Sequence, residues 1–156
     1  MGGRAFAWAR TMNKLQLPIL VLGGIIVLSA GTCSNKDPDK QHAMSGFAEG
    51  KWVLENLNGQ EVQVPKGTET PYIATDSTGE SISGFAGCNR LSGGVKIAGD
   101  SISFPGLLST RMYCVETQML ENSFLDALRA TRTFTVKGDV LTLSSGKELA
   151  VLRHRK

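Results

Sequence analysis

Apolar and polar residues alternate in short runs over most of the chain after residue 50. Such a period of two is typical of strands with one buried face. Turn residues separate the runs about every 8–12 positions, as in antiparallel sandwiches and barrels. Asn58-Gly59 is the strongest turn, because both central residues of a two-residue hairpin loop need positive φ. The predicted strands hold Trp52 and Leu54, Val62 and Val64, Tyr72 to Thr75, Ser81 to Phe85, Val95 and Ile97, Ile102 and Phe104, Phe134 and Val136, Leu141 and Leu143, and Leu149 and Val151.

Residues 115–130 follow a helical period instead. The segment contains no Gly or Pro, and its apolar residues fall on one helical face. These residues are Leu120, Phe124, Leu125 and Leu128. The complete pattern predicts a β-rich α+β fold: an antiparallel barrel-like or strongly curved sheet with one α-helix at about 115–130.

Glu121 falls inside the apolar arc of this helix, between Leu125 and Leu128. A carboxylate in such a place must be paired, hydrogen-bonded or protonated. Two interpretations follow. Glu121 is a binding or catalytic acid, or it is a structural group that ties the helix to the sheet through Arg111, Arg90 or backbone N–H groups.

The first 32 residues have the pattern of an export signal. Residues 17–30 are apolar, follow Lys14, and are shorter than the ~20 residues that a transmembrane helix needs. The run ends at Ala30-Gly31-Thr32-Cys33, which resembles a bacterial lipobox in which Cys33 receives the lipid. The alternatives are ordinary cleaved secretion and a retained anchor; all three export the remaining chain to an oxidising compartment.

Residues 33–49 are mostly polar and carry both signs of charge, so we expect a flexible tether. The domain is predicted over residues 50–153, followed by a basic, solvated tail. Three basic and no acidic residues lie in 1–32, and 14 basic and 14 acidic residues follow. This balance argues against a nucleic-acid partner, which requires a basic surface on the folded part.

Two clusters carry an unusual combination of residues. The first runs from Ser83 to Gly94 and contains Gly87-Cys88-Asn89-Arg90, and the second runs from Ser109 to Cys114 and contains Thr110-Arg111-Met112-Tyr113-Cys114. With Trp52, Leu54 and the Glu121 helix, they resemble the META domain of HslJ-like exported bacterial lipoproteins. The resemblance covers roughly residues 50–152. It implies a compact β-rich fold with one helix, and associations with the cell envelope, stress and antibiotic tolerance, but no established activity. We assign a structural or binding role to Gly87, Asn89, Arg90, Thr110, Arg111 and Glu121.

Cys88 and Cys114 form an even pair in an exported domain, since Cys33 is accounted for by the lipobox. A structural disulfide is the first interpretation. Two buried thiols that never pair, or a redox pair, are the alternatives, although the spacing is unlike Cys-x-x-Cys.

No catalytic, cofactor or metal site is predicted. His42 falls in the tether and His154 in the basic tail, so neither completes a catalytic triad or a zinc site within the domain. We therefore expect a non-enzymatic, monomeric envelope lipoprotein that binds a ligand or an envelope protein. It is held at a membrane by its lipid, the outer rather than the inner one. The alternatives are an inhibitor or chaperone-like partner of an exported protein and, less favoured, a hydrolase or redox enzyme. The enzyme alternative predicts a concave pocket that gathers Glu121, Arg111 and Asn89.

Overall fold

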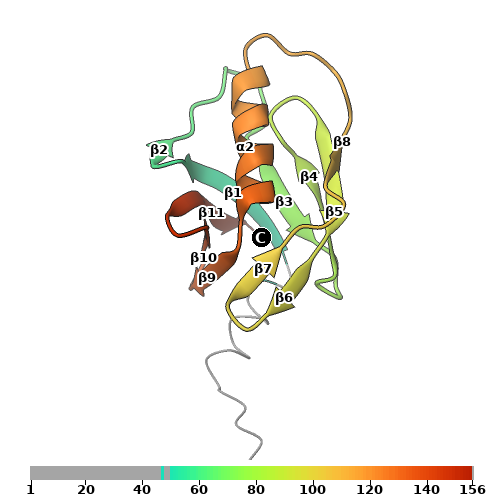
Figure 1. The fold of residues 1–156 in the computed structure, drawn as a ribbon. Helices are drawn as coiled ribbons and strands as arrows, with labels where there is room; N and C mark the ends of the chain where they lie inside the picture. The colour runs from blue at the N-terminus through green and yellow to red at the C-terminus, as the bar shows by residue number, and fades with distance from the viewer. Residues whose placement is uncertain (1–46, 48–49, 156) are drawn as a thin grey trace, which may run out of the picture. The chain divides into compact units, whose positions relative to one another are not determined.

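The computed structural model describes Phe47 and residues 50–155. Residues 50–155 form an 11-stranded antiparallel sheet that curls into a half-barrel, with one helix, α2 (Gln118–Ala130), against it (Figure 1). The predicted fold class is thereby confirmed. The export signal, Cys33 and His42 lie outside the described residues, as does the tether apart from Phe47. The strands are β1 (Gly50–Leu57), β2 (Gln60–Glu61), β3 (Tyr72–Thr75), β4 (Ser81–Phe85), β5 (Arg90–Gly94), β6 (Lys96–Ala98), β7 (Ser101–Ser103), β8 (Leu108–Ser109), β9 (Thr133–Lys137), β10 (Val140–Ser144) and β11 (Glu148–Arg155).

The sheet has the order β6-β7-β9-β10-β11-β1-β3-β4-β5-β8, and β2 pairs with β1 beside this path. The long strands β1 and β11 pair at its centre, so the two ends of the domain sequence meet there. Helix α2 follows β8, the last strand at one end of the sheet, and leads into β9 near the other end.

The hydrophobic core lies between α2 and the concave face of the sheet. Phe124 and Leu128 of α2 are fully buried, and Trp52 of β1 is 1% exposed. Phe47 is also fully buried, stacks on Trp52 at 6.4 Å between ring centroids and contacts Phe134. Large side chains therefore fill the inside of the curved sheet. The other fully buried apolar side chains include Leu54, Ile73, Leu141, Leu143 and Leu152.

The predicted hairpin at Asn58-Gly59 is present, with φ of 53° and 78° at its two central residues. The strand after it is shorter than predicted, because β2 ends at Glu61. Val62 still donates its N–H to the carbonyl of Glu55. Val64 lies outside the sheet, immediately before Pro65, which has no N–H to donate to a ladder.

The alternation of apolar and polar residues did not predict two of the strands, β5 and β8. β5 contains one large apolar residue, Leu91, and ends in two glycines, and β8 has only two residues. Val95 and Phe104 were predicted in strands, but both flank strands and are nevertheless buried. Burial rather than strand geometry explains their place in the apolar pattern.

Helix α2 begins at Gln118, not at residue 115. The carbonyl of Cys114 accepts hydrogen bonds from the N–H groups of both Thr117 and Gln118, so residues 115–117 form a turn that leads into the helix. The C-terminal end of the prediction, Ala130, is correct.

The prediction of a solvated basic tail is wrong for Arg153 and His154, which are partly buried, whereas Arg155 is exposed at the end of β11. These residues belong to β11, where Arg153 pairs with Val53 and His154 with Trp52. Arg153 forms ion pairs with Glu55 and Asp139, and the His154 ring lies 5.0 Å from the ring of Trp52. Cross-strand partners therefore hold this segment in the sheet despite its polar composition.

Gly84 allows the close approach of β3 and β4. A Cβ there would overlap the carbonyl oxygen of Tyr72. We expect Gly84→Ala to lower the free energy of unfolding by about 1–3 kcal/mol, because backbone has to move. Urea unfolding measures the loss, with Ser83→Ala on the exposed face of the same strand as control, expected within about 0.5 kcal/mol of wild type. Equal effects of the two substitutions would contradict this account of Gly84.

The turn between β3 and β4 is organised by Asp76. Its carboxylate accepts hydrogen bonds from the hydroxyls of Ser81 (2.7 Å) and Thr78 (2.9 Å) and from the N–H of Glu80 (3.1 Å). These bonds, that of Ser81 first, lower the pKa of Asp76 from 3.8 to about 2. The lowered pKa means that the carboxylate contributes stability above about pH 4, and that this contribution is lost as the pH falls towards 2.

The stability advantage of wild type over Asp76→Asn should therefore shrink as the pH falls from about 4 to 2. Urea unfolding of both proteins across this range measures the difference. A difference that does not change with pH would show that the charge of Asp76 does not stabilise the turn.

Candidate functional site

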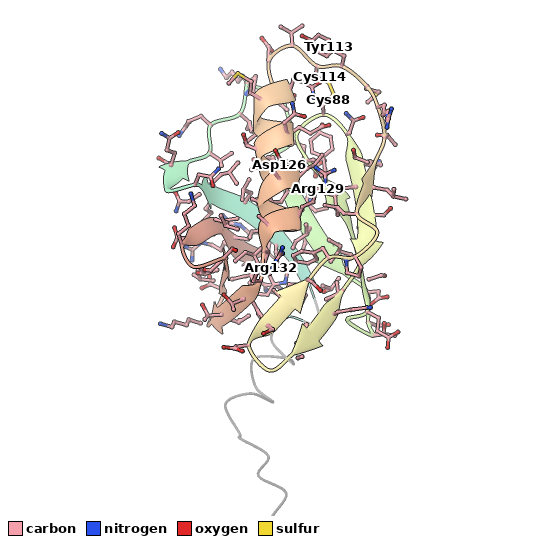
Figure 2. All side chains as sticks on the ribbon, in the orientation of Figure 1. Cys88, Tyr113, Cys114, Asp126, Arg129 and Arg132 are labelled. Atoms are coloured by element: carbon pink, nitrogen blue, oxygen red, sulfur yellow. A yellow bond between two sulfur atoms is a disulfide. The ribbon has the colours of Figure 1, made fainter. Side chains whose placement is uncertain are left out.

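The two sequence clusters meet at one end of the domain. The turn between β4 and β5 holds Gly87, Cys88 and Asn89, and the segment between β8 and α2 holds Thr110 to Cys114. A disulfide joins Cys88 to Cys114, with 5.8 Å between their Cα atoms. Figure 2 shows this bond beneath the loop that carries Tyr113. The predicted pairing is thus present in the structure. The disulfide fastens the loop before α2 to the sheet.

Asn89 is the centre of a hydrogen-bond network and is 1% exposed. Its Oδ1 accepts from the Thr110 hydroxyl (2.8 Å) and the Met112 N–H (2.7 Å), and its Nδ2 donates to the Met112 carbonyl (2.9 Å). One buried amide thus pairs with the backbone of a segment more than 20 residues away. Asn89 fixes the path of residues 110–112.

Glu121 completes this network from the helix and is 4% exposed. Its Oε2 accepts from the N–H groups of Asn89 (2.7 Å) and Cys88 (3.2 Å), and its Oε1 accepts from Asn89 Nδ2 (2.9 Å). We call Asn89, Thr110 and Glu121, with these bonds, the Asn89–Glu121 lock. The carboxylate connects the helix to the sheet through N–H groups of residues 88 and 89.

The remaining motif residues have other places. Arg90 and Arg111 are exposed, and no hydrogen bond in the described part of the chain joins either guanidinium to Glu121. The backbone of Arg90 exchanges bonds with Thr110: its carbonyl accepts from the Thr110 N–H (3.0 Å) and its N–H donates to the hydroxyl (3.2 Å). Gly87 has a φ of 121°, which favours glycine at this corner. Of the proposed ties for Glu121, the structure contains the backbone one.

The polar side-chain atoms of Asn89 and Glu121 are already hydrogen-bonded within the protein. Both oxygens of Glu121 and both polar atoms of Asn89 already have partners inside the protein. Within residues 50–155, no three His, Cys, Asp or Glu side chains are grouped closely enough to hold a metal ion. None of the helices among the described residues has the length and apolarity that crossing a membrane requires. The arrangement holds the segment of residues 110–112 against the corner at residues 88 and 89.

The loop that the lock holds, with Leu108 of β8 before it and Met119 of α2 after it, presents apolar side chains to solvent. Tyr113, Val115 and Met119 are each more than 75% exposed, and Leu108 and Met112 more than 60%. We call these five residues the apolar loop surface. The alternation of apolar and polar residues does not predict this surface. Met119 gave a signal, since it lies in a helix but not on the apolar face. Exposed large apolar side chains are candidates for contact with a partner.

A groove also runs between this loop and α2, with a volume of about 330 Å³. Asn89, Glu121 and Leu125 are among its lining residues, with Gln118, Asn122 and Arg129 from the helix and residues 109–113 from the loop. A wider, open groove of about 850 Å³ lies beside the β6–β7 hairpin, where Val95, Ile97 and Ile102 are among its lining residues. The pocket that the hydrolase or redox alternative needs is present in outline, because Glu121, Arg111 and Asn89 all line the groove between the loop and α2. The wider groove was not predicted, because it is formed by segments that are distant in sequence.

Comparison with known proteins identifies relatives for nearly the whole described part. The family model of the META domain matches residues 45–156. Heat shock protein HslJ of Escherichia coli is 34% identical over 102 residues, which cover 63% of this chain and 69% of HslJ. An NMR structure of a protein from Burkholderia xenovorans is 26% identical with a TM-score of 0.61, covering 76% of this chain and 90% of that one. A crystal structure of a DUF4847 family protein from Bacteroides vulgatus shares the fold, at 17% identity and a TM-score of 0.50, covering 70% and 95% of the two chains.

Proposed function

The chain belongs to the META domain family, and from this premise we propose that it is a non-enzymatic lipoprotein of the cell envelope whose domain is a stress-related binding module. The observation that carries the proposal is that one set of residues at the site holds the structure together while another set is exposed to solvent. Three polar motif residues, Asn89, Thr110 and Glu121, hold the scaffold together through the Asn89–Glu121 lock. The scaffold in turn displays the apolar loop surface. A binding module needs such a fixed, exposed surface, whereas an enzyme needs reactive groups that are free to act.

Two further observations support the cellular setting. The apolar run at 17–30 followed by Cys33 supports a lipid anchor at a membrane, the outer one in this proposal. The disulfide supports an oxidising compartment. The stress association comes from the relative that is named heat shock protein HslJ.

Mass spectrometry of the intact protein from membranes of its native host tests the anchor. We expect a chain that begins at Cys33 and carries a diacylglyceryl group and an acyl chain. A loss of two hydrogens without reductant reports the disulfide. Cys33→Ser should yield a chain with no lipid. A wild-type chain without lipid would overturn the anchored part of the proposal.

Complementation tests the binding module. A strain that lacks the protein is heated and supplied with wild type, with Tyr113→Ser and Met119→Ser combined, or with Glu116→Ala. We expect the Tyr113 and Met119 variant to fail and the exposed Glu116 variant to complement, with unchanged thermal unfolding of all three proteins. Full complementation by the Tyr113 and Met119 variant would remove the apolar loop surface from the function.

The sheet edges favour a second candidate, an inhibitor or chaperone-like partner of an exported protein. Strands β6 and β8 end the sheet path, and neither has a strand partner on its outer side within residues 50–155. A free edge is able to accept an extended segment of another protein. A stable complex with one envelope enzyme, whose activity falls on binding, would favour this candidate over the binding module.

A further inference from the structure

The groove between α2 and the loop has one regular wall. Gln118, Asn122, Leu125 and Arg129 recur at three- and four-residue intervals, so they form one stripe along the helix that faces residues 109–113. From Gln118 to Arg129 the helix rises about 16 Å. An extended peptide covers that length with about five residues.

The sides of this groove carry several side-chain hydrogen-bond donors. Arg111 on the loop and Arg129 on the helix supply guanidinium groups, each with several N–H donors. Gln118 Nε2 donates to Asn122 Oδ1 (3.2 Å), which occupies the oxygen and leaves the amide NH₂ of Asn122 to donate. Such a donor set matches the carbonyl and carboxylate oxygens of a ligand.

Two acidic groups near the groove are already engaged. Glu121 is the acidic residue of the lining, and its oxygens accept the N–H bonds of the lock. Asp126 pairs with Arg129 at 3.1 Å, but the two side chains are 76% and 52% exposed. A pair so open to water is weak, and Arg129 is able to exchange it for a ligand carboxylate.

We propose that this groove binds an extended acidic peptide segment, with its carboxylates on Arg111 and Arg129. Tyr113 and Met112 line the same groove, next to the loop tip, and cover an apolar side chain of the segment there. Figure 2 shows Tyr113 at the tip of the loop and Arg129 further along the helix, so the two ends of the groove have different chemistry. The inference rests on the proposed binding function and names its ligand class.

Fluorescence anisotropy with the full-length protein in detergent tests this inference. The probe is a fluorescein-labelled pentapeptide with glutamate at positions one, three and five, which point to one side of an extended chain. The matched peptide has glutamine at the same three positions. We expect the glutamine peptide to bind at least about tenfold more weakly, because it offers no charge-assisted bonds. Added salt should weaken binding of the acidic peptide.

The protein variants locate the site. Arg111→Ala combined with Arg129→Ala should weaken the acidic peptide at least about tenfold, while Lys137→Ala, an exposed basic residue of β9, should bind like wild type. Equal affinity for the two peptides, no binding of the acidic one, or unchanged binding by the double variant would each overturn the inference. Inorganic phosphate that competes at the concentration of the peptide would show a site for isolated oxyanions instead.

The peptide-binding result and the complementation result can fail independently of each other. If the acidic peptide does not bind while the Tyr113 and Met119 variant still fails to complement, the binding module stands and its ligand class is different. If the acidic peptide binds the groove but the Arg111 and Arg129 double variant, supplied in the same complementation, restores growth like wild type, the groove binds the peptide but the heat-stressed cell does not require it.

Discussion

Glu121→Ala should lower the free energy of unfolding by about 2–5 kcal/mol. The substitution leaves the N–H groups of Cys88 and Asn89, two residues that are at most 5% exposed, without their acceptor. Each buried donor that loses its partner costs about 1–3 kcal/mol. Asn89 Nδ2 still donates to the Met112 carbonyl, so it adds less. Urea unfolding with the disulfide intact measures the loss.

The matched control is Glu116→Ala, which removes an exposed glutamate from the turn before the same helix. We expect it to stay within about 0.5 kcal/mol of wild type. In an Asn89→Ala background, Glu121→Ala should cost less than in wild type, because part of the lock is already missing. A small effect of Glu121→Ala in wild type would mean that the carboxylate is not structural, and would return the interpretation of Glu121 as a binding or catalytic acid.

The position of Glu121 could be predicted from sequence, but its partners could not. Helical periodicity places the residue on the apolar face, which requires it to be paired. Which groups satisfy it depends on the corner at residues 86–89, more than 30 positions away. From sequence alone, Arg90, Arg111 and backbone N–H groups were all possible partners of the Glu121 carboxylate. In the folded domain the backbone is the partner, because the N–H groups of Cys88 and Asn89 face the helix.

The strands, too, were only partly predictable from the sequence. Period-two alternation identified β1, β3, β4, β9, β10 and β11, where one face is buried against α2 or the core. It missed β5, whose Ser92, Gly93 and Gly94 carry no apolar signal. That strand exists because β4 and β8 pair with it on both sides. The groove had no local signal either, because its polar walls become a site only when the lock sets residues 109–113 beside α2.

The combination of Cys88→Ala and Cys114→Ala should lower the free energy of unfolding by about 3.5 kcal/mol and the unfolding midpoint by roughly 15 °C. The disulfide closes a loop of 26 residues, and the unfolded chain gains freedom when it is removed. The folded state should persist, because Asn89 still holds residues 110–112 through three hydrogen bonds. Thermal unfolding with and without reductant measures the effect. Reductant should lower the midpoint of wild type and leave that of the double variant unchanged.

The slope of urea unfolding separates this effect from that of Glu121. Removal of the cross-link expands the unfolded chain, so the dependence of the unfolding free energy on urea should become steeper. Glu121→Ala acts on the folded state and should leave that slope unchanged. A wild-type midpoint that reductant does not move would mean that the bond does not stabilise the domain. A lower midpoint with an unchanged slope would place the contribution of the disulfide in the folded state, next to that of the Asn89–Glu121 lock.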